Sequence, residues 1–142
     1  MRRFTTAFAL GAFAFGALAL GALPASPVAR ADEFTKTDVD RWQGEFDTVV
    51  KRGRELWTSG EVGTNGVACA QCHPNAANTH PETYPKFQKQ LGKVAQLFEM
   101  VNWCIRNPLQ GAPIAADDPK MTAFISYIHY ERRGVPLAPG KH

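Results

Sequence analysis

The residues of this chain whose types and spacing could do chemistry stand in one run: Cys69, Ala70, Gln71, Cys72 and His73. Two thiols at this spacing can add across the two vinyl groups on one edge of a porphyrin, with one thioether bond formed by each. The histidine directly after the second thiol is then held under the iron, where its imidazole can be the proximal ligand. This C-x-x-C-H pattern is typical of a covalent c-type haem site.

Three other chemistries share part of the pattern. A zinc site needs about four ligands in closed geometry, and the sequence has no second Cys/His pair. A redox C-x-x-C pair opens a helix after a strand in a βαβ unit, and no such pattern precedes Cys69. A structural disulfide between Cys69 and Cys72 is the remaining alternative. The spacing favours one covalent haem c, bound through Cys69, Cys72 and His73.

The first 31 residues have the features of an export signal. Arg2 and Arg3 form a positive start, an apolar run follows from Phe4 to Leu23, and Ala29 and Ala31 have the spacing of a cleavage site. We expect a cleavable secretory signal peptide at 1–31, and a haem domain at 32–142 in the periplasm. An uncleaved membrane anchor is the alternative, because the apolar run is about long enough to span a bilayer.

Removal of the signal changes the charge balance. The whole chain has 16 Lys+Arg and 13 Asp+Glu. Residues 1–31 hold three of the basic residues (Arg2, Arg3 and Arg30) and no acidic ones, so 13 of each kind are left. A chain with this balance does not have the basic surface that nucleic-acid binding requires. We therefore expect no nucleic-acid partner, and no membrane span after cleavage.

Three stretches with apolar residues at steps of three and four predict helices around the motif. The first has Thr37 as its expected N-cap and ends at Ser59 and Gly60, and the second covers 94–105. The third runs from Asp118 to Arg133, with Asp118 as the expected N-cap and Pro119 at the first helical position. A short helical turn is expected at 86–90 and a loose tail at 135–142. No stretch alternates as a half-buried strand does, so the sequence predicts an all-α domain with long loops.

Two residues on these helices have particular interest. Gly53 lies inside the apolar stripe of the first helix, where glycine costs roughly 1 kcal/mol relative to alanine. We therefore expect close contact with another helix there. Cys104 lies on the inward stripe of the second helix, and it is left over once haem takes two of the three cysteines. An odd cysteine in an exported protein indicates intermolecular pairing or a thiol with a function.

Together, the motif and its helices resemble a class I c-type cytochrome over 50–130. The resemblance implies a small fold of three to four helices around one covalent haem. In that fold the first and last helices cross at a glycine–aromatic contact. The resemblance therefore implies that Gly53 and Trp57 meet Phe124 and Tyr127.

Within that class, three stretches are similar to the haem domains of sulfur-compound oxidation, namely the A subunit of the Sox cytochrome complex and thiosulfate dehydrogenase. The stretches are Gly60–His73, the pair Tyr84–Pro85, and Met100–Gly111. In those proteins the cysteine of the matching helix is the distal haem ligand, so the resemblance implies a Cys104 thiolate opposite His73. Both of those enzymes work with a second haem, whereas this sequence has one attachment motif.

The distal ligand has several candidates. Iron(III) in a porphyrin carries net positive charge, which lowers the pKa of a thiol and favours Cys104 as a thiolate ligand. Met100 is one turn earlier on the same helix face, and methionine is the usual ligand of class I carriers. Met121, in the first turn of the last helix, and His80, in the loop after His73, are two further candidates.

These features favour a periplasmic electron-transfer protein, alone or as the haem subunit of an oxidoreductase, over a stand-alone enzyme. Its expected partner is a redox protein, either a second cytochrome subunit or a dehydrogenase. One alternative is a haem subunit that oxidises sulfur compounds, with Cys104 at the reaction centre and Arg106 near an anion. Another is a gas-binding or redox-sensing cytochrome.

Overall fold

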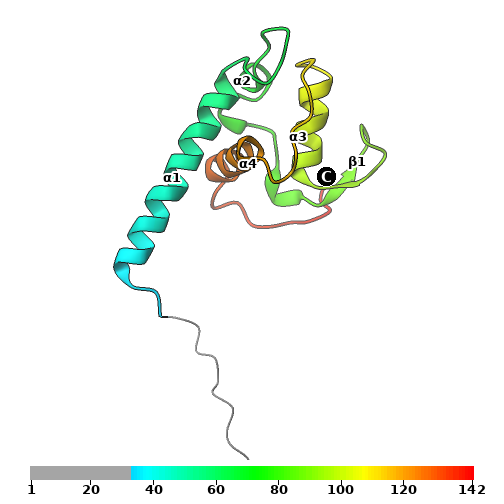
Figure 1. The fold of residues 1–142 in the computed structure, drawn as a ribbon. Coiled ribbons are helices and arrows are strands. Elements are labelled where there is room, and N and C mark those ends of the chain that lie inside the picture. Colours follow the sequence, from blue (N-terminus) through cyan, green and yellow to red (C-terminus); the bar gives the residue numbers. More distant parts are fainter. Residues whose placement is uncertain (1–32) are drawn as a thin grey trace, which may run out of the picture. The chain divides into compact units, whose positions relative to one another are not determined.

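The computed structural model describes residues 33–142 of the chain, and the predicted signal peptide at 1–31 lies outside them. Four α-helices, two short 3₁₀ helices and a two-stranded sheet make up the described residues (Figure 1). In chain order they are α1 (Lys36–Thr58), α2 (Cys69–Cys72), η1 (Pro74–Ala76), η2 (Pro81–Thr83), β1 (Lys86–Gln88), β2 (Lys93–Ala95), α3 (Leu97–Arg106) and α4 (Pro119–Glu131). The small helical fold agrees with the predicted class.

Helix α1 begins earlier than its sequence pattern indicated. Its N-cap is Thr35, whose hydroxyl accepts a hydrogen bond from the Asp38 backbone at 3.2 Å, while the Asp38 carboxylate accepts from the Thr35 backbone at 3.2 Å. This reciprocal capping box satisfies two backbone donors at once, which explains why Thr35 and not Thr37 caps the helix. The helix ends at Ser59, as predicted.

The core forms where the C-terminal half of α1 packs against α4. Gly53 lies so close to α4 that an added Cβ would be 2.0 Å from the Ala123 carbonyl oxygen and 2.6 Å from the Tyr127 Cβ. Beside it, the Trp57 ring lies 6.2 Å from the Phe124 ring and 5.7 Å from the Tyr127 ring, measured between centroids. The predicted glycine–aromatic crossing is confirmed.

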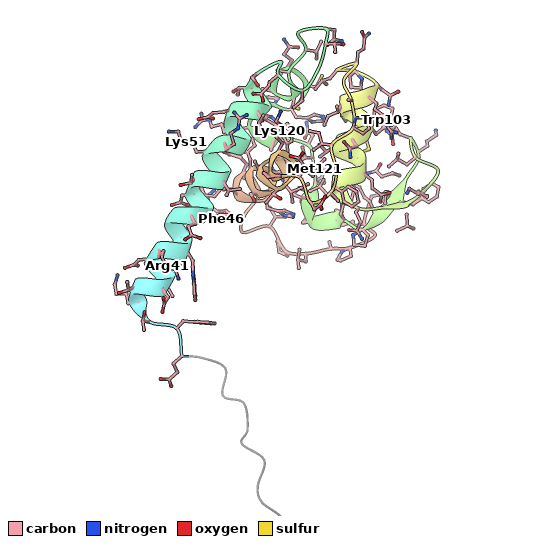
Figure 2. All side chains as sticks on the ribbon, in the orientation of Figure 1. Arg41, Phe46, Lys51, Trp103, Lys120 and Met121 are labelled. Carbon is pink, nitrogen blue, oxygen red and sulfur yellow. The ribbon has the colours of Figure 1, made fainter. Side chains whose placement is uncertain are left out.

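The N-terminal half of α1 does not share this contact. Val39, Trp42 and Phe46 are 52%, 39% and 40% exposed, although they continue the apolar stripe of the packed half. Phe46 is labelled on this outer part of α1 in Figure 2, and its ring lies 6.5 Å from that of Tyr130. Helix α4 has 13 residues and α1 has 23, so α4 covers only the C-terminal half of the apolar stripe.

Helices α3 and α4 line the rest of the core. Asp118 caps α4 by accepting from the Lys120 backbone at 2.7 Å, and Pro119 occupies its first turn, as predicted. Met121 is 1% exposed and lies in the interior (Figure 2). The largest fully buried side chains come from α1, α3 and α4, and they are Tyr127, Phe124, Leu56, Ile105, Met121 and Ile128.

Two short segments differ from the sequence prediction. The helical turn expected at 86–90 was wrong: β1 pairs there with β2 in antiparallel register, with Phe87 opposite Val94. The tail was expected to be loose, but its backbone donates from Ala138 to the Glu82 carbonyl at 2.8 Å and from Gly140 to the Thr83 carbonyl at 2.9 Å. Over the described residues, no helix is long and apolar enough to cross a membrane.

Candidate functional site

A cavity of about 440 Å³ lies between the C-x-x-C-H segment, α3 and the β-hairpin. Cys69, Cys72 and His73 line it on one side, and Met100 and Cys104 of α3 line it on another. Apolar side chains supply most of the remaining wall, namely those of Trp57, Ala68, Leu97, Val101, Trp103, Pro108, Leu109 and Ile128. The structure thus brings all four predicted site residues around one cavity of the size that cofactor sites have.

The local backbone explains how the motif reaches the cavity. Cys69 to Cys72 form the single turn of α2, and the His73 backbone donates to the Cys69 carbonyl at 2.9 Å. The next residues turn sharply, because Asn75 and Ala76 have φ angles of 49° and 55° in the left-handed region. This turn brings the carbonyl of Ala77 back to the His73 ring.

Two hydrogen bonds fix the position and the tautomer of His73. Its ring Nδ1 lies 2.9 Å from the Ala77 carbonyl oxygen. A carbonyl can only accept, so the proton is on Nδ1 and the lone pair of Nε2 is left for a metal. The indole Nε1–H of Trp57 donates to the His73 carbonyl oxygen at 2.8 Å. A histidine ligand of a metal is oriented in this way by its surroundings.

Of the three cysteines around the cavity, Cys69 and Cys104 are partly buried and Cys72 is exposed. Burial, and then the neighbouring Cys104, raise the pKa of the Cys69 thiol to about 11. Burial, and then Cys72, also raise the pKa of Cys104. All three cysteines are free thiols. The alternative of a Cys69–Cys72 disulfide therefore finds no support in the structure.

A polar group of side chains closes another end of the cavity. The amide of Gln88 donates to the Tyr84 phenol oxygen, and the Lys86 ammonium lies 5.0 Å from the centre of the Tyr84 ring. Burial raises the pKa of Tyr84 to about 12, so the phenol keeps its proton and can donate it. Together with Gln90, these side chains offer hydrogen-bond donors and one positive charge, which is what binding of a carboxylate group requires. Sequence reasoning did not identify this group as part of the site: Tyr84 was noted only in the Tyr84–Pro85 resemblance, and Lys86 lies in a segment expected to form a helical turn.

Several sequence candidates lie away from the cavity. Met121, in the first turn of α4, is buried in the core, and His80 is exposed with its Nδ1 2.9 Å from Glu82. Neither lines the cavity, and neither does the exposed Arg106. Among the described residues, no three Cys, His, Asp or Glu side chains are grouped to hold a metal ion directly. Of the distal candidates, Cys104 and Met100 are the two that line the cavity.

Comparison with known proteins places the chain in a family. The SoxA/TsdA cytochrome c domain model matches residues 52–137. The L-cysteine S-thiosulfotransferase subunit SoxA of Rhodovulum sulfidophilum is 32% identical over 113 residues, which cover 77% of this chain and 39% of that protein. The thiosulfate dehydrogenase of Psychrobacter arcticus is 26% identical over 107 residues, which cover 66% of this chain and 32% of that protein. The chain therefore spans about two fifths or less of the length of these relatives.

A solved structure has the same fold. The SoxXA crystal structure from P. pantotrophus superimposes with a TM-score of 0.62 at 23% identity, over 72% of this chain and 40% of that one.

The cavity fits the cofactor of this family. It offers two thiols one helical turn apart, an imidazole with a free Nε2, apolar walls for a porphyrin, and a polar end for its carboxylates. A porphyrin spans such a space, which explains why the donor side chains surround a cavity and do not converge on one point. The chain belongs to the SoxA/TsdA cytochrome c domain family, and the cofactor of that family is covalently bound haem c.

Proposed function

We propose that this chain carries electrons through one haem c, attached at Cys69 and Cys72, with His73 and Cys104 as the two axial ligands. The observation that carries the proposal is the position of these four side chains around one cavity, with the Nδ1 of His73 bonded to a carbonyl. In the attachment, each thiol adds across one vinyl group. Its sulfur bonds to one vinyl carbon and its hydrogen to the other, so no oxidant or leaving group is needed.

Cys104 would lose its proton when it binds the iron. Burial raises the pKa of this thiol, which disfavours a free thiolate. A bound cation has the opposite effect and deprotonates a coordinating thiol. We therefore expect a thiolate only in the haem-loaded protein, with the proton released to solvent.

The haem iron supplies a one-electron couple between iron(III) and iron(II). A thiolate donates electron density and favours iron(III), whereas a methionine ligand favours a higher potential. With Cys104 bound, the protein would therefore be a low-potential carrier. Buried walls around the cavity, such as Leu97 and Val101, would keep water away from the couple.

A potentiometric titration of the purified haem protein tests the carrier function. We expect a reversible one-electron curve whose midpoint rises in Cys104→Ala. Mass spectrometry under denaturing conditions should find haem on the wild-type chain and no doubly attached haem on Cys72→Ala. A haem that extracts from the wild-type chain, or a midpoint that Cys104→Ala leaves unchanged, would contradict the proposal.

The names of the relatives favour a second candidate, a haem subunit for oxidation of a sulfur compound at Cys104. Joining two thiosulfate ions through a sulfur–sulfur bond releases two electrons, and one haem iron accepts one. The reaction would therefore need a second one-electron carrier, such as a partner cytochrome subunit, and the SoxXA structure is named for such a pair. A catalytic current that requires thiosulfate and is lost in Cys104→Ala would favour this candidate. An unchanged voltammogram would favour the simple carrier.

We also propose that residues 1–31 are a cleaved export signal and that the domain at 32–142 works in the periplasm. The positive start, apolar run and small-residue exit support this. Attachment of haem c after export is consistent with it. N-terminal sequencing of the haem protein from a periplasmic extract should begin at Asp32. A haem protein retained in the membrane fraction with Met1 or Arg2 at its start would support the anchor alternative.

A further inference from the structure

Two loops from distant parts of the sequence are bonded together beside the cavity, at the top of the view in Figure 1. One precedes the C-x-x-C-H segment and the other follows α3. Thr64 donates from its backbone to the Leu109 carbonyl at 3.0 Å and from its hydroxyl to the Gln110 carbonyl at 2.8 Å. The Asn65 amide donates to the Pro108 carbonyl at 2.9 Å. We call these paired segments, residues 62–65 and 108–111, the clasp.

Two glycines allow the clasp to close. A Cβ added at Gly111 would lie 1.9 Å from the Val62 carbonyl oxygen, and one at Gly63 would lie 2.6 Å from the Leu109 carbonyl oxygen. Real Cβ atoms do not approach a backbone oxygen this closely. Any side chain at either position therefore has to push the two loops apart.

The clasp is bonded directly to the backbone of Cys104. The Leu109 backbone donates to the Cys104 carbonyl at 3.2 Å, and the Gly111 backbone donates to the Ile105 carbonyl at 2.7 Å. These bonds satisfy carbonyls at the end of α3 that have no partner within the helix. Through Leu109, two successive hydrogen bonds connect Cys104 to Thr64.

The other side of the clasp leads into the haem motif. The Asn65 side-chain oxygen accepts from the Val67 backbone at 3.1 Å, and Ala68 is the N-cap of α2. Glu61, just before the clasp, pairs with Arg52 of α1 at 3.0 Å and with Lys120 of α4 at 3.2 Å. The segment that delivers Cys69 is thus held to the main helices and to α3 at once.

We propose that the clasp is a positioning device that sets the distance across the cavity between His73 on one side and Cys104 on the other. Its positioning residues are Thr64, Asn65 and Gly111. The inference rests on the proposed His73/Cys104 ligation and adds the residues that hold the Cys104 thiolate within reach of the iron. Loss of a clasp contact moves the end of α3 outward and weakens the bond from Cys104 to the iron.

The test compares the ferric haem proteins of wild type, Thr64→Val and Gly111→Ala by EPR, together with their equilibrium binding of cyanide. Valine keeps the shape of Thr64 but removes its hydroxyl hydrogen bond. We expect a weaker low-spin thiolate signal and cyanide affinity raised about fivefold, the factor that corresponds to one net hydrogen bond. Thr64→Ser keeps the hydroxyl, so its EPR signal and its cyanide affinity should equal those of wild type. Gly111→Ala should have the larger effect.

Gly44→Ala is the matched control, because a Cβ at Gly44 meets nothing within 4 Å. It should leave both readouts at wild-type values. If Gly111→Ala does not fold, the comparison of Thr64→Val with Thr64→Ser still tests the clasp proposal. A variant that melts at a lower temperature but keeps the wild-type spectrum and cyanide affinity would show a merely structural contact and overturn the proposal.

The Cys104→Ala variant distinguishes a failure of the clasp proposal from a failure of the proposed Cys104 ligation. If wild type has a thiolate signal that Cys104→Ala lacks, and the clasp variants keep that signal unchanged, only the clasp proposal fails. If wild type has no thiolate signal at all, the ligation in the proposed function fails and the clasp proposal fails with it.

Discussion

At the scale of single residues, a point mutation can test the close contact of Gly53 with α4. Gly53→Ala places a methyl group against the Ala123 carbonyl and the Tyr127 side chain. Overpacking of this kind typically costs about 1–3 kcal/mol. We expect the free energy of unfolding, measured by urea denaturation of the haem protein, to fall by that amount.

Gly44→Ala is again the matched control for this measurement. Gly44 lies on the exposed half of the same helix and has open space around it. Alanine there should stabilise the protein by roughly 0.5–1 kcal/mol through the helix backbone. Equal effects of both substitutions on unfolding would argue against the helix crossing.

Glu82 gives a prediction for pH dependence. Burial alone would raise its pKa, but the hydrogen bonds from His80 and from the backbone, with the charge of Arg132, outweigh burial and lower the pKa below 4.5. A carboxyl whose pKa is lower in the folded state stabilises the fold above its unfolded pKa. That contribution is lost as the pH falls from about 4.5 through the folded pKa.

Urea denaturation across the acidic range checks this prediction. As the pH is lowered from neutral to below 4.5, the free energy of unfolding should fall less for Glu82→Gln than for wild type. Glu45→Gln, at an exposed position of α1, should follow the wild-type curve. If the free energy of unfolding of Glu82→Gln followed the same pH dependence as that of wild type, the Glu82 carboxylate would contribute nothing to the pH dependence of stability.

At the scale of elements, the tail at 135–142 is held to the rest of the domain by backbone hydrogen bonds, although its sequence predicted a loose segment. Ala138 and Gly140 donate to the carbonyls of Glu82, Thr83 and Pro85 at 2.8–3.1 Å. At about 1 kcal/mol net for each bond, deletion of 137–142 should lower the free energy of unfolding by roughly 1–3 kcal/mol. Deletion of Lys141 and His142 alone keeps these bonds and should have little effect.

The short elements are also where prediction from sequence failed. β1 and β2 have three residues each, too few to establish an alternating pattern, and Phe87 of β1 and Val94 of β2 are both exposed. The bonds of the tail run through backbone atoms, which the side-chain sequence does not specify. By contrast, α4 was predicted from Asp118 and Pro119, because capping chemistry is local and acts through these residues themselves.

The residues around the candidate site also divide into those that could be predicted from sequence and those that could not. Cys69, Cys72 and His73 were predicted from their spacing, since haem attachment requires neighbours in sequence. Cys104 was predicted as an odd cysteine on an apolar stripe and by resemblance. The place of Tyr84 and Lys86 at the cavity was missed, although Tyr84 was noted in the family resemblance, because only the tertiary fold brings these side chains there. The role of the clasp glycines was missed for the same reason, since Gly63 contacts Leu109 and Gly111 contacts Val62, in each case far along the sequence.

At the scale of the whole molecule, we expect the family cofactor to complete the hydrophobic core by filling the cavity. The domain has few helices, and a cavity of about 440 Å³ separates α3 from the haem motif. A group that binds only the folded state stabilises it. The double variant Cys69→Ala/Cys72→Ala should therefore keep part of its helical circular dichroism but lose cooperative thermal unfolding, as a molten state does.

Cys104→Ala is the control for that prediction, because it keeps both attachment thiols. It should retain the haem and unfold cooperatively. A sharp transition in the double variant, at the wild-type temperature, would contradict a structural role for the cofactor.

The ligation by His73 and Cys104 is the central claim, and the EPR and absorption spectra of the ferric protein test it most directly. We expect a low-spin signal with thiolate character that is present in wild type and Met100→Leu and absent from Cys104→Ala. A methionine-to-iron charge-transfer band at the red edge of the visible spectrum, present in wild type and Cys104→Ala and lost in Met100→Leu, would contradict it.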